Sequence, residues 1–506
     1  MISKKLRQVM AASMAVVMTV GLAACGEKAP ATTDPTKAPE ATKAPATQET
    51  QKPADDKKDE PAPTEAPAQD PNYTEEGYFI RRDASGEIVN LGGANIVVRD
   101  WWSPEDWPGE PSNAYETAQQ DYLAWAQETY NFTITRQTIG DWGSNPQDFI
   151  DYCTTGGDDN YYVFTLRADP GINTAMMSGL VCDLSSLDGA INLNDEKWNK
   201  TRVHQLYNFK GKSYAVAPGV PECRGIIFFN KRLLTEAGID WKELYAKESD
   251  PTWWTWDKFK ELLAKCTYDK DNDGTNDVYG IAANWGNMYT GLIYANGGSY
   301  VDLQDGKLVN NLESKATLEA LNYGWEIRKQ FAYEQPADGT WEYYKDAFNN
   351  GVYAFLPDDA YYGANLKAGC NDEWGAVCYP TGPSANGRFI GAVADNLYAI
   401  PGCYSADKAW KCAFAYDIMC DEVPGFEDFE TWQSQYEKNF DDIEAIDVSI
   451  RAAISDASVQ YVSLVTGISV GSDLSWYGFS DDNTPAQVAE SIREKWNAAI
   501  DEFNNQ

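Results

Sequence analysis

Residues 211–240 read GKSYAVAPGVPECRGIIFFNKRLLTEAGID, and they carry the clearest information on how this chain folds. The apolar run 225–229 is followed by Asn230 and Lys231, and a run with apolar residues on one side continues to Gly238. This order predicts a strand, a turn, a helix and a glycine that ends the helix. A strand that leads directly into a helix is typical of an α/β protein.

The segments before this unit alternate in the same way. Strands are predicted at 88–98, 132–139 and 161–166, with helices at 113–129 and 172–179. A strand, a helix and a second strand in succession imply a parallel sheet with right-handed crossovers. The later part of the chain continues both element types. Helices are expected at 256–266, 317–331, 341–350 and 486–503, strands at 351–355 and 389–400, and a mostly helical chain after 406.

The N-terminus has the pattern of a lipoprotein signal peptide. Three cationic residues at 4, 5 and 7 precede the apolar run 9–22, which is short for a membrane span and ends in the letters LAAC, a sequence that resembles a bacterial lipobox. We expect cleavage after residue 24, with the thiol of Cys25 carrying lipid. The protein would then be anchored on the extracellular face of the cell membrane.

Residues 25–71 are predicted to form a disordered tether. After Cys25 this segment holds alanine, proline, threonine and charged residues, with no aromatic or large aliphatic residue. Such a composition cannot bury enough apolar surface to offset the entropy lost on folding. The remaining part, 72–506, is too long for one hydrophobic core, so two lobes are expected.

The composition excludes several classes of function. A formal net charge of −36 argues against binding to nucleic acid or to anionic lipid. The chain has a single histidine, His204, which excludes histidine-rich metal sites. A serine or cysteine triad would need this one histidine as its base. No catalytic residue is expected.

Ten cysteines leave the disulfide pattern open. Nine remain if Cys25 carries lipid, so at least one of them is unpaired or shared between molecules. Cys370 and Cys378 are close enough in sequence to pair, but other pairings are equally allowed. We favour buried free thiols.

The stretch 211–240, together with the letters TWDKF at 255–259, resembles the hinge-crossing segment of bacterial extracellular solute-binding proteins. Members of this family are the sugar-receptor subunits of ABC importers. The resemblance extends over about 88–503 and is sharpest between 211 and 280. It implies a periplasmic-binding-protein-like fold, in which a multi-strand hinge joins two α/β lobes with a ligand cleft between them.

The resemblance also implies how the chain divides and what it does. Lobe 1 is expected at about 85–218 and 351–377, and lobe 2 at about 225–350 and 384–506. The expected function is the capture of a carbohydrate, with an oligosaccharide favoured, for delivery to the permease subunits of an ABC importer. The protein is expected to act as a monomer.

Residues 269–277, DKDNDGTND, predict a structural calcium site. Oxygen ligands at alternate positions with a glycine at position six are what Ca²⁺ requires in such a loop. Position twelve is Gly280 in place of the usual glutamate. Water or a carboxylate from elsewhere must therefore complete the shell. The predicted ligands are Asp269, Asp271, Asp273, Thr275 and Asp277.

Polar and aromatic residues follow the predicted strands at their carboxyl ends, where open α/β sheets bind ligands. Aromatic rings stack on the C–H faces of sugars, and carboxylates and amides bind the hydroxyl groups. The predicted ligand-binding residues are Trp101, Trp102, Asp141, Trp142, Arg167, Trp285, Asp359, Tyr361, Tyr362, Asp395 and Asn396.

Two alternatives belong to other functional classes. Because carboxylates are abundant, a surface enzyme that degrades glycans is one of them. A calcium-dependent adhesion module is the other, although the chain has one such loop where dockerins use two. The identity and length of the sugar do not follow from the sequence, and neither does the permease partner.

Overall fold

The computed structural model describes residues 70–168, 170–199, 206–209, 211–393, 396–426, 430–475, 479 and 483–505. The chain divides into two units, Met1–Ile80 and Arg81–Gln506. In the first unit, a bridge joins Tyr73 and Phe79. The signal peptide, Cys25 and the tether up to residue 69 lie outside the described residues, as do His204 and Asp395. None of the described helices is long and apolar enough to span a bilayer.

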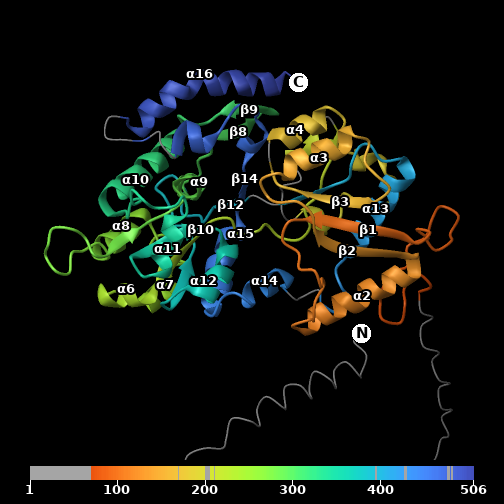
Figure 1. Cartoon of the computed structure of the whole chain (residues 1–506), viewed down its shortest axis with the longest axis horizontal. Helices are drawn as coiled ribbons and strands as arrows, with labels where there is room; N and C mark the ends of the chain where they lie inside the picture. Colours follow the sequence, from red (N-terminus) through yellow and green to blue (C-terminus); the bar gives the residue numbers. More distant parts are fainter. Residues whose placement is uncertain are drawn as a thin grey trace, which may run out of the picture. The chain divides into compact units, whose positions relative to one another are not determined.

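The first sheet of Arg81–Gln506 has the strand order β13-β3-β1-β2. Strand β1 pairs in parallel with both β2 and β3, as predicted, and β13 is antiparallel to β3. Helices α2, α3, α4 and α13 pack around it (Figure 1). The bounds are β1 Ala94–Asp100, β2 Phe132–Thr138, β3 Tyr161–Leu166, β13 Leu397–Ala399, α2 Ala114–Tyr130, α3 Asn145–Thr154, α4 Pro170–Met177 and α13 Ala406–Met419.

The second sheet has the order β11-β6-β10-β7. The unit predicted from 211–240 is confirmed: β6 is completely buried, and the side chain of Asn230 accepts a hydrogen bond from the Leu233 N–H to cap α6. The neighbours β10 and β11 are both antiparallel to β6, while β7 is parallel to β10. The strand bounds are β6 Ile226–Asn230, β7 Tyr279–Ile281, β10 Tyr353–Asp358 and β11 Trp374–Val377.

The remaining elements are helices and two-stranded ribbons outside the two four-stranded sheets. Their helices are α5 Glu196–Asn199, α6 Lys231–Glu236, α7 Trp241–Lys247, α8 Trp256–Lys265, α9 Trp285–Ala295, α10 Lys315–Phe331, α11 Tyr343–Asn349, α12 Gly363–Gly369, α14 Ser434–Glu437, α15 Arg451–Ser455 and α16 Pro485–Asn504. The ribbons are β4 Asn208–Phe209 with β5 Lys212–Ser213, β8 Val301–Gln304 with β9 Lys307–Asn310, and β12 Gly391–Val393 with β14 Ala457–Val459. Two π-helical turns, η5 Ala445–Ile450 and η7 Gly471–Ser475, occur late in the chain.

The strand pairing corrects two expectations about the lobes. Residues 351–377 were expected in lobe 1, but β10 and β11 belong to the second sheet. Residues after 384 were expected in lobe 2, but β13 pairs with β3, and α13 packs on β1, β2 and β3 of the first sheet. The expected strand 389–400 is in fact two short strands, β12 and β13. A short apolar strand carries no local signal for its distant partner, so its sheet cannot be read from its own residues.

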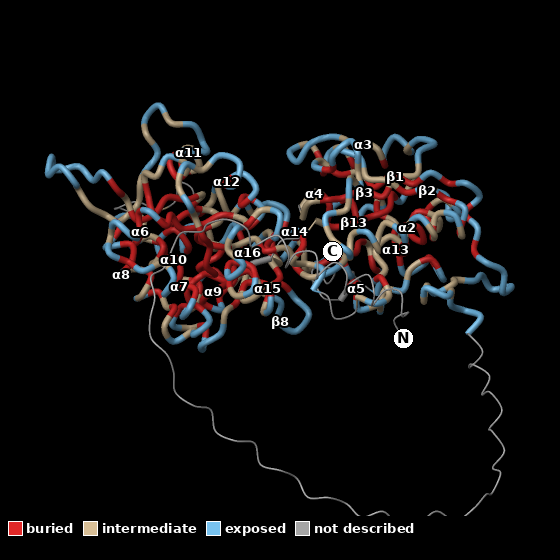
Figure 2. The backbone as a smooth tube through the Cα atoms, turned by 90° about the horizontal axis from the view of Figure 1, so that it is seen from below, coloured by how far each residue is buried: buried red, intermediate tan, exposed pale blue. Residues whose placement is uncertain are grey.

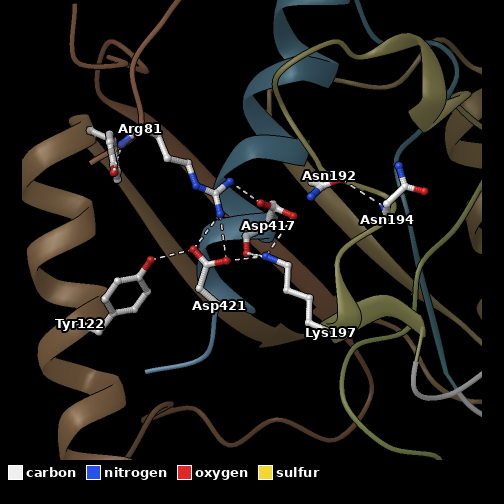
Figure 3. Close-up of polar contacts among 8 residues, drawn as sticks. Arg81, Tyr122, Asn192, Asn194, Lys197, Asp417 and Asp421 are labelled. Atoms are coloured by element: carbon white, nitrogen blue, oxygen red, sulfur yellow. Dashed lines mark hydrogen bonds and ion pairs between the residues drawn. The ribbon is translucent and has the colours of Figure 1, made fainter. Parts of the chain in front are cut away.

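Buried residues concentrate along the strands and on the sheet-facing sides of the helices (Figure 2). A charged network joins Arg81, the first residue of the second unit, to the helices that pack on the first sheet (Figure 3). Arg81 pairs with Asp417 and Asp421, and Asp421 also accepts a 2.7 Å hydrogen bond from the Tyr122 hydroxyl. The Lys197 ammonium is 3.1 Å from Asp417 and donates to its backbone carbonyl. Each buried charge is therefore compensated, which is what burial of ions requires.

Candidate functional site

The carboxyl ends of the parallel strands in the first sheet present aromatic rings, which form part of a surface that we call the first wall (Trp101, Trp102, Asp141, Trp142 and Arg167). Strand β1 ends at Asp100, whose carboxylate accepts hydrogen bonds from the Ser103 N–H at 2.9 Å and the Ser103 hydroxyl at 2.6 Å. These bonds fold the chain into a turn that carries Trp101 and Trp102, whose ring centroids are 4.8 Å apart. Trp102 is 47% exposed. A ring held at a turn with one face open can stack on a ligand.

The loops after β2 and β3 meet at Trp142 and Arg167. The Arg167 guanidinium lies 4.4 Å from the centroid of the Trp142 ring, which is 59% exposed. Asp141 accepts hydrogen bonds from the backbone N–H groups of Gly143 and Ser144, and these bonds hold its pKa below the usual range. Asp141 therefore shapes the loop, while Trp142 keeps its second face open.

The end of β10 carries a cluster of charged and aromatic groups, the second wall (Glu222, Arg224, Asp358, Asp359 and Tyr361). Because β6 is antiparallel to β10, with Asp358 opposite Ile226, the residues just before β6 lie beside the end of β10. The Arg224 guanidinium is 2.8 Å from the Glu222 carboxylate and 3.5 Å from that of Asp359. It also lies 5.5 Å from the ring centroid of Tyr361, which is 48% exposed.

Burial dominates the electrostatics of the second wall. Burial and the neighbouring Asp359 raise the pKa of Asp358 to about 7. Burial also raises the pKa values of Glu222 and Asp359, against the opposing effect of Arg224. Asp358 is 4% exposed, and its Oδ2 has no hydrogen-bond partner among the described residues. Carboxyl groups in such surroundings gain from a ligand that donates hydrogen bonds to them.

Two predicted residues lie in the packed interior. Trp285 is the first residue of α9 and is 5% exposed, with the Arg328 guanidinium 4.8 Å above its ring. Tyr362 is 6% exposed, and its ring packs against Phe228 and the Lys345 ammonium. Both follow a strand end as predicted, but Trp285 begins α9 and Tyr362 ends the 3₁₀ turn η3, Ala360–Tyr362, and both rings are turned inward. Asn396 is half-buried directly before β13, and Asp395 lies outside the described residues.

Glu222 and Arg224 of the second wall are not among the residues predicted from the sequence. Both stand in the quoted stretch, immediately before the buried strand β6. Their position beside β10 follows only from the antiparallel pairing of β6 with β10. In the sequence, the only sign of their role is that this charged pair directly precedes a fully apolar strand.

A separate cavity of about 830 Å³ contains none of the predicted residues. It runs along the edge strand β2 and is lined by α2, the end of α13 and aromatic rings that include Tyr115 and Trp432. Lys197 and Asp421 in its lining belong to the charged network and are bonded to each other. A ligand would have to compete with those internal bonds, so this cavity is a weaker candidate than the two walls.

The loop after α8 brings three predicted metal ligands together. Carboxylate oxygens of Asp269, Asp271 and Asp273 all lie within 4.8 Å of one another. Gly274 has a φ of 95°, and its N–H donates to Asp269 at 2.8 Å, which closes the turn. A Cβ at Gly280 would lie 2.8 Å from the Leu263 carbonyl oxygen, so no side chain could supply the twelfth-position ligand there. The three carboxylates fit a hard divalent cation whose shell water completes.

The pentapeptide Gly467–Gly471, GISVG, matches the G-x-S-x-G letters of serine hydrolases. That motif acts at a sharp turn from a strand into an α-helix. Here the 3₁₀ helix η6, Tyr461–Leu464, precedes the pentapeptide, and the π-helical turn η7 follows it. The structural context of a nucleophile is therefore not met at Ser469.

Comparison with known proteins identifies a family. A family profile described as bacterial extracellular solute-binding protein matches residues 154–411. No curated protein matches the chain. Among solved structures, the ABC substrate-binding protein Lmo0181 from Listeria monocytogenes, in complex with cycloalternan, aligns with a TM-score of 0.54 at 16% identity, over 81% of this chain and 99% of its own.

Two further structures agree. The cyclic α-maltosyl-1,6-maltose binding protein from Arthrobacter globiformis aligns with a TM-score of 0.54 at 15% identity, and the GacH receptor of Streptomyces glaucescens with 0.53 at 14%. Each alignment covers 81% of this chain and 99% of the other. At these identities the likeness shows the fold, and it confirms the predicted α/β architecture of two lobes.

Proposed function

Because the chain belongs to the bacterial extracellular solute-binding proteins, we propose that it captures an oligosaccharide between the first and second walls and delivers it to an ABC importer. Exposed rings on both walls support this function. Trp102 and Trp142 offer open faces on the first wall, and Tyr361 offers one on the second. Sugar rings present flat C–H faces that stack on such surfaces, as other ligands do on aromatic side chains.

The polar groups of the second wall complement sugar hydroxyls. Arg224 offers hydrogen-bond donors, while Glu222, Asp358 and Asp359 offer acceptors. Burial disfavours the charged form of these carboxyl groups. A mixed set of this kind binds hydroxyl groups, which both donate and accept. The inward-facing Trp285 and Tyr362 would then support the wall from behind. The protein binds its solute without catalysis.

We also propose that Ca²⁺ occupies the loop 269–277 and has a structural role. Asp269, Asp271 and Asp273 would supply carboxylate oxygens, with Thr275 acting through its carbonyl and Asp277 through water. Asp277 already accepts a 2.6 Å hydrogen bond from the Lys270 N–H and so closes the loop. The metal would stiffen this turn.

Anchoring by lipid at Cys25 is the remaining proposal, and it rests on the letters LAAC at 22–25. Mass spectrometry of the membrane fraction should find an N-terminal peptide that begins at Cys25 and carries diacylglycerol. An unmodified N-terminus would refute the anchor.

Thermal unfolding of the protein with calcium, against a panel of oligosaccharides, tests the binding function. A ligand that binds only the folded state at a hundredfold excess over Kd stabilises it by about 2.7 kcal/mol. We expect the melting temperature to rise with one class of glycan, which is then recovered intact. No shift with any glycan would refute the sugar assignment, and shortened products would favour a glycan-degrading enzyme.

A further inference from the structure

The cavity of about 830 Å³ along the edge strand β2 is separate from both walls, because no residue of either wall lies in its described lining. Its volume falls in the range of sites that hold small organic molecules. Helix α2 supplies one side: Tyr115, Gln119, Leu123 and Gln127 recur every four residues and so share one face of the helix. The strand β2 supplies Arg136 to the same space. A helix face and the edge of a sheet therefore enclose a defined hollow.

Arg136 is a mostly buried cation with few contacts. Its side chain is 17% exposed, and the guanidinium lies 3.7 Å from the Asp100 carboxylate, which is beyond hydrogen-bond distance. The guanidinium donates to the Tyr398 hydroxyl at 3.3 Å. The Asp100 carboxylate is already occupied, because it accepts hydrogen bonds from the backbone N–H and the hydroxyl of Ser103. A guanidinium has five N–H donors, so most of those on Arg136 have no acceptor among the described residues.

The other charged groups of the described lining have partners of their own or are exposed. The Lys197 ammonium is 2.5 Å from the Asp421 carboxylate. Glu430 forms a two-point ion pair with the guanidinium of Arg451, and Glu422 is exposed. A ligand that pairs with the guanidinium on β2 would therefore leave these internal bonds intact.

Aromatic rings are frequent in the remaining lining of the cavity. The rings of Tyr115 and Phe426 meet edge to face with their centroids 5.6 Å apart, and Trp107 and Trp432 also line the space. Three glutamines of α2 stand among them. Flat rings pack on aromatic side chains, while amide groups bond to the polar substituents of a ring. The lining thus suits a ring-shaped molecule that carries an anionic group.

We propose that this cavity is a second binding site, which holds a small organic oxyanion whose carboxylate or phosphate group pairs with Arg136. A guanidinium and such a group can form two parallel hydrogen bonds. The ring of the ligand lies among the aromatic side chains, and its polar substituents face the glutamines. Because a buried charge is costly without a counter-ion, the bound anion supplies the partner that the fold does not provide. This site does not depend on glycan binding at the walls.

Calorimetric titration of the protein with ring compounds tests the proposal. Phenylacetate and glucuronate carry a carboxylate on an aromatic ring and on a sugar ring, phenyl phosphate carries a phosphate, and benzyl alcohol is the neutral counterpart. We expect saturable binding of one anion per chain, with no binding of benzyl alcohol at the same concentration. The anion that binds most tightly shows whether the oxyanion is a carboxylate or a phosphate. Equal binding of benzyl alcohol, or no saturable binding of any of the anions, would overturn the proposal.

The cation itself is tested by substitution. Arg136→Met should lower the affinity for the bound anion about 10- to 100-fold, which is the loss expected when a charged hydrogen-bonded pair is removed. The matched control Arg388→Met removes an exposed arginine that pairs with Asp456, and it should leave the affinity for the anion unchanged. Wild-type affinity in Arg136→Met would overturn the proposal.

A second variant tests the cavity while it keeps the buried charge in place. Gln119→Trp adds a larger ring to the cavity face of α2 and should abolish anion binding, whereas Asp121→Trp, at an exposed position of the same helix, should not. Anion binding that persists in Gln119→Trp would overturn the proposal. The anion and the glycan selected by thermal unfolding should bind to one chain at the same time. Competition between them would assign the anion to the walls and would also overturn the proposal.

Discussion

Replacing Trp142 with alanine should weaken glycan binding without unfolding the protein. The residue is 59% exposed, and Arg167 covers one face of its ring at 4.4 Å. A tryptophan side chain has a surface of up to about 250 Å², so about 150 Å² is accessible and roughly half of it, about 75 Å², belongs to the open face. At about 25 cal/mol per Å², covering that face contributes about 1.9 kcal/mol. The expected loss is therefore about 25-fold in Kd.

Calorimetric titration of the glycan that shifts the melting temperature measures this loss. Trp142→Phe is the matched control: it keeps an aromatic face, so most of the affinity should remain. Both variants should melt close to the wild-type temperature, because an exposed ring contributes little to the core. Affinity of Trp142→Ala within twofold of wild type would refute the assignment of this ring to the ligand site.

Three further predictions concern other parts of the molecule. Arg224→Met leaves Glu222 and Asp359 without their cation, so the melting temperature and the glycan affinity should both fall. Arg224→Lys should restore part of each. Wild-type values in Arg224→Met would contradict this role of Arg224. Asp271→Asn should abolish the calorimetric signal of Ca²⁺, whereas Asp305→Asn, in another loop, should not; an unchanged signal would place the metal elsewhere. Burial raises the pKa of Glu248 to about 8 from 4.5, so between these pH values the folded state keeps a proton that the unfolded state releases. The contribution of protonated Glu248 to the free energy of unfolding is therefore complete below about pH 4.5. It falls by about 1.4 kcal/mol per pH unit up to pH 8. Glu248→Gln should remove this slope in urea unfolding, and parallel pH profiles would sink the prediction.

The parts that could be predicted from sequence are those set by local residues. The apolar run 225–229 and the capping Asn230 determine β6 and α6 by themselves, and both were found where expected. The rings at the ends of β1 and β2 were also placed correctly at strand ends, because the parallel pairing of these strands follows from the strand–helix–strand order.

The parts that could not be predicted depend on distant pairing. Strand β10 lies between β6 and β7, and only this arrangement brings Arg224 beside Asp359. The position of a residue along the chain also does not show whether its side chain points into the interior or toward solvent. Trp285 follows the end of β7 as expected, yet α9 begins at that residue and its ring is buried. Expectations for Asp395 and Cys25 lie outside the described residues.

The central claim is that this chain is a receptor that binds one glycan and leaves it unaltered. The most direct test is a calorimetric titration of the calcium-loaded protein with the glycan selected by thermal unfolding, with the glycan analysed by mass afterwards. The account predicts saturable binding of one glycan per chain and recovery of the glycan at its original mass. The absence of saturable binding, or recovery of shortened glycan, would contradict it.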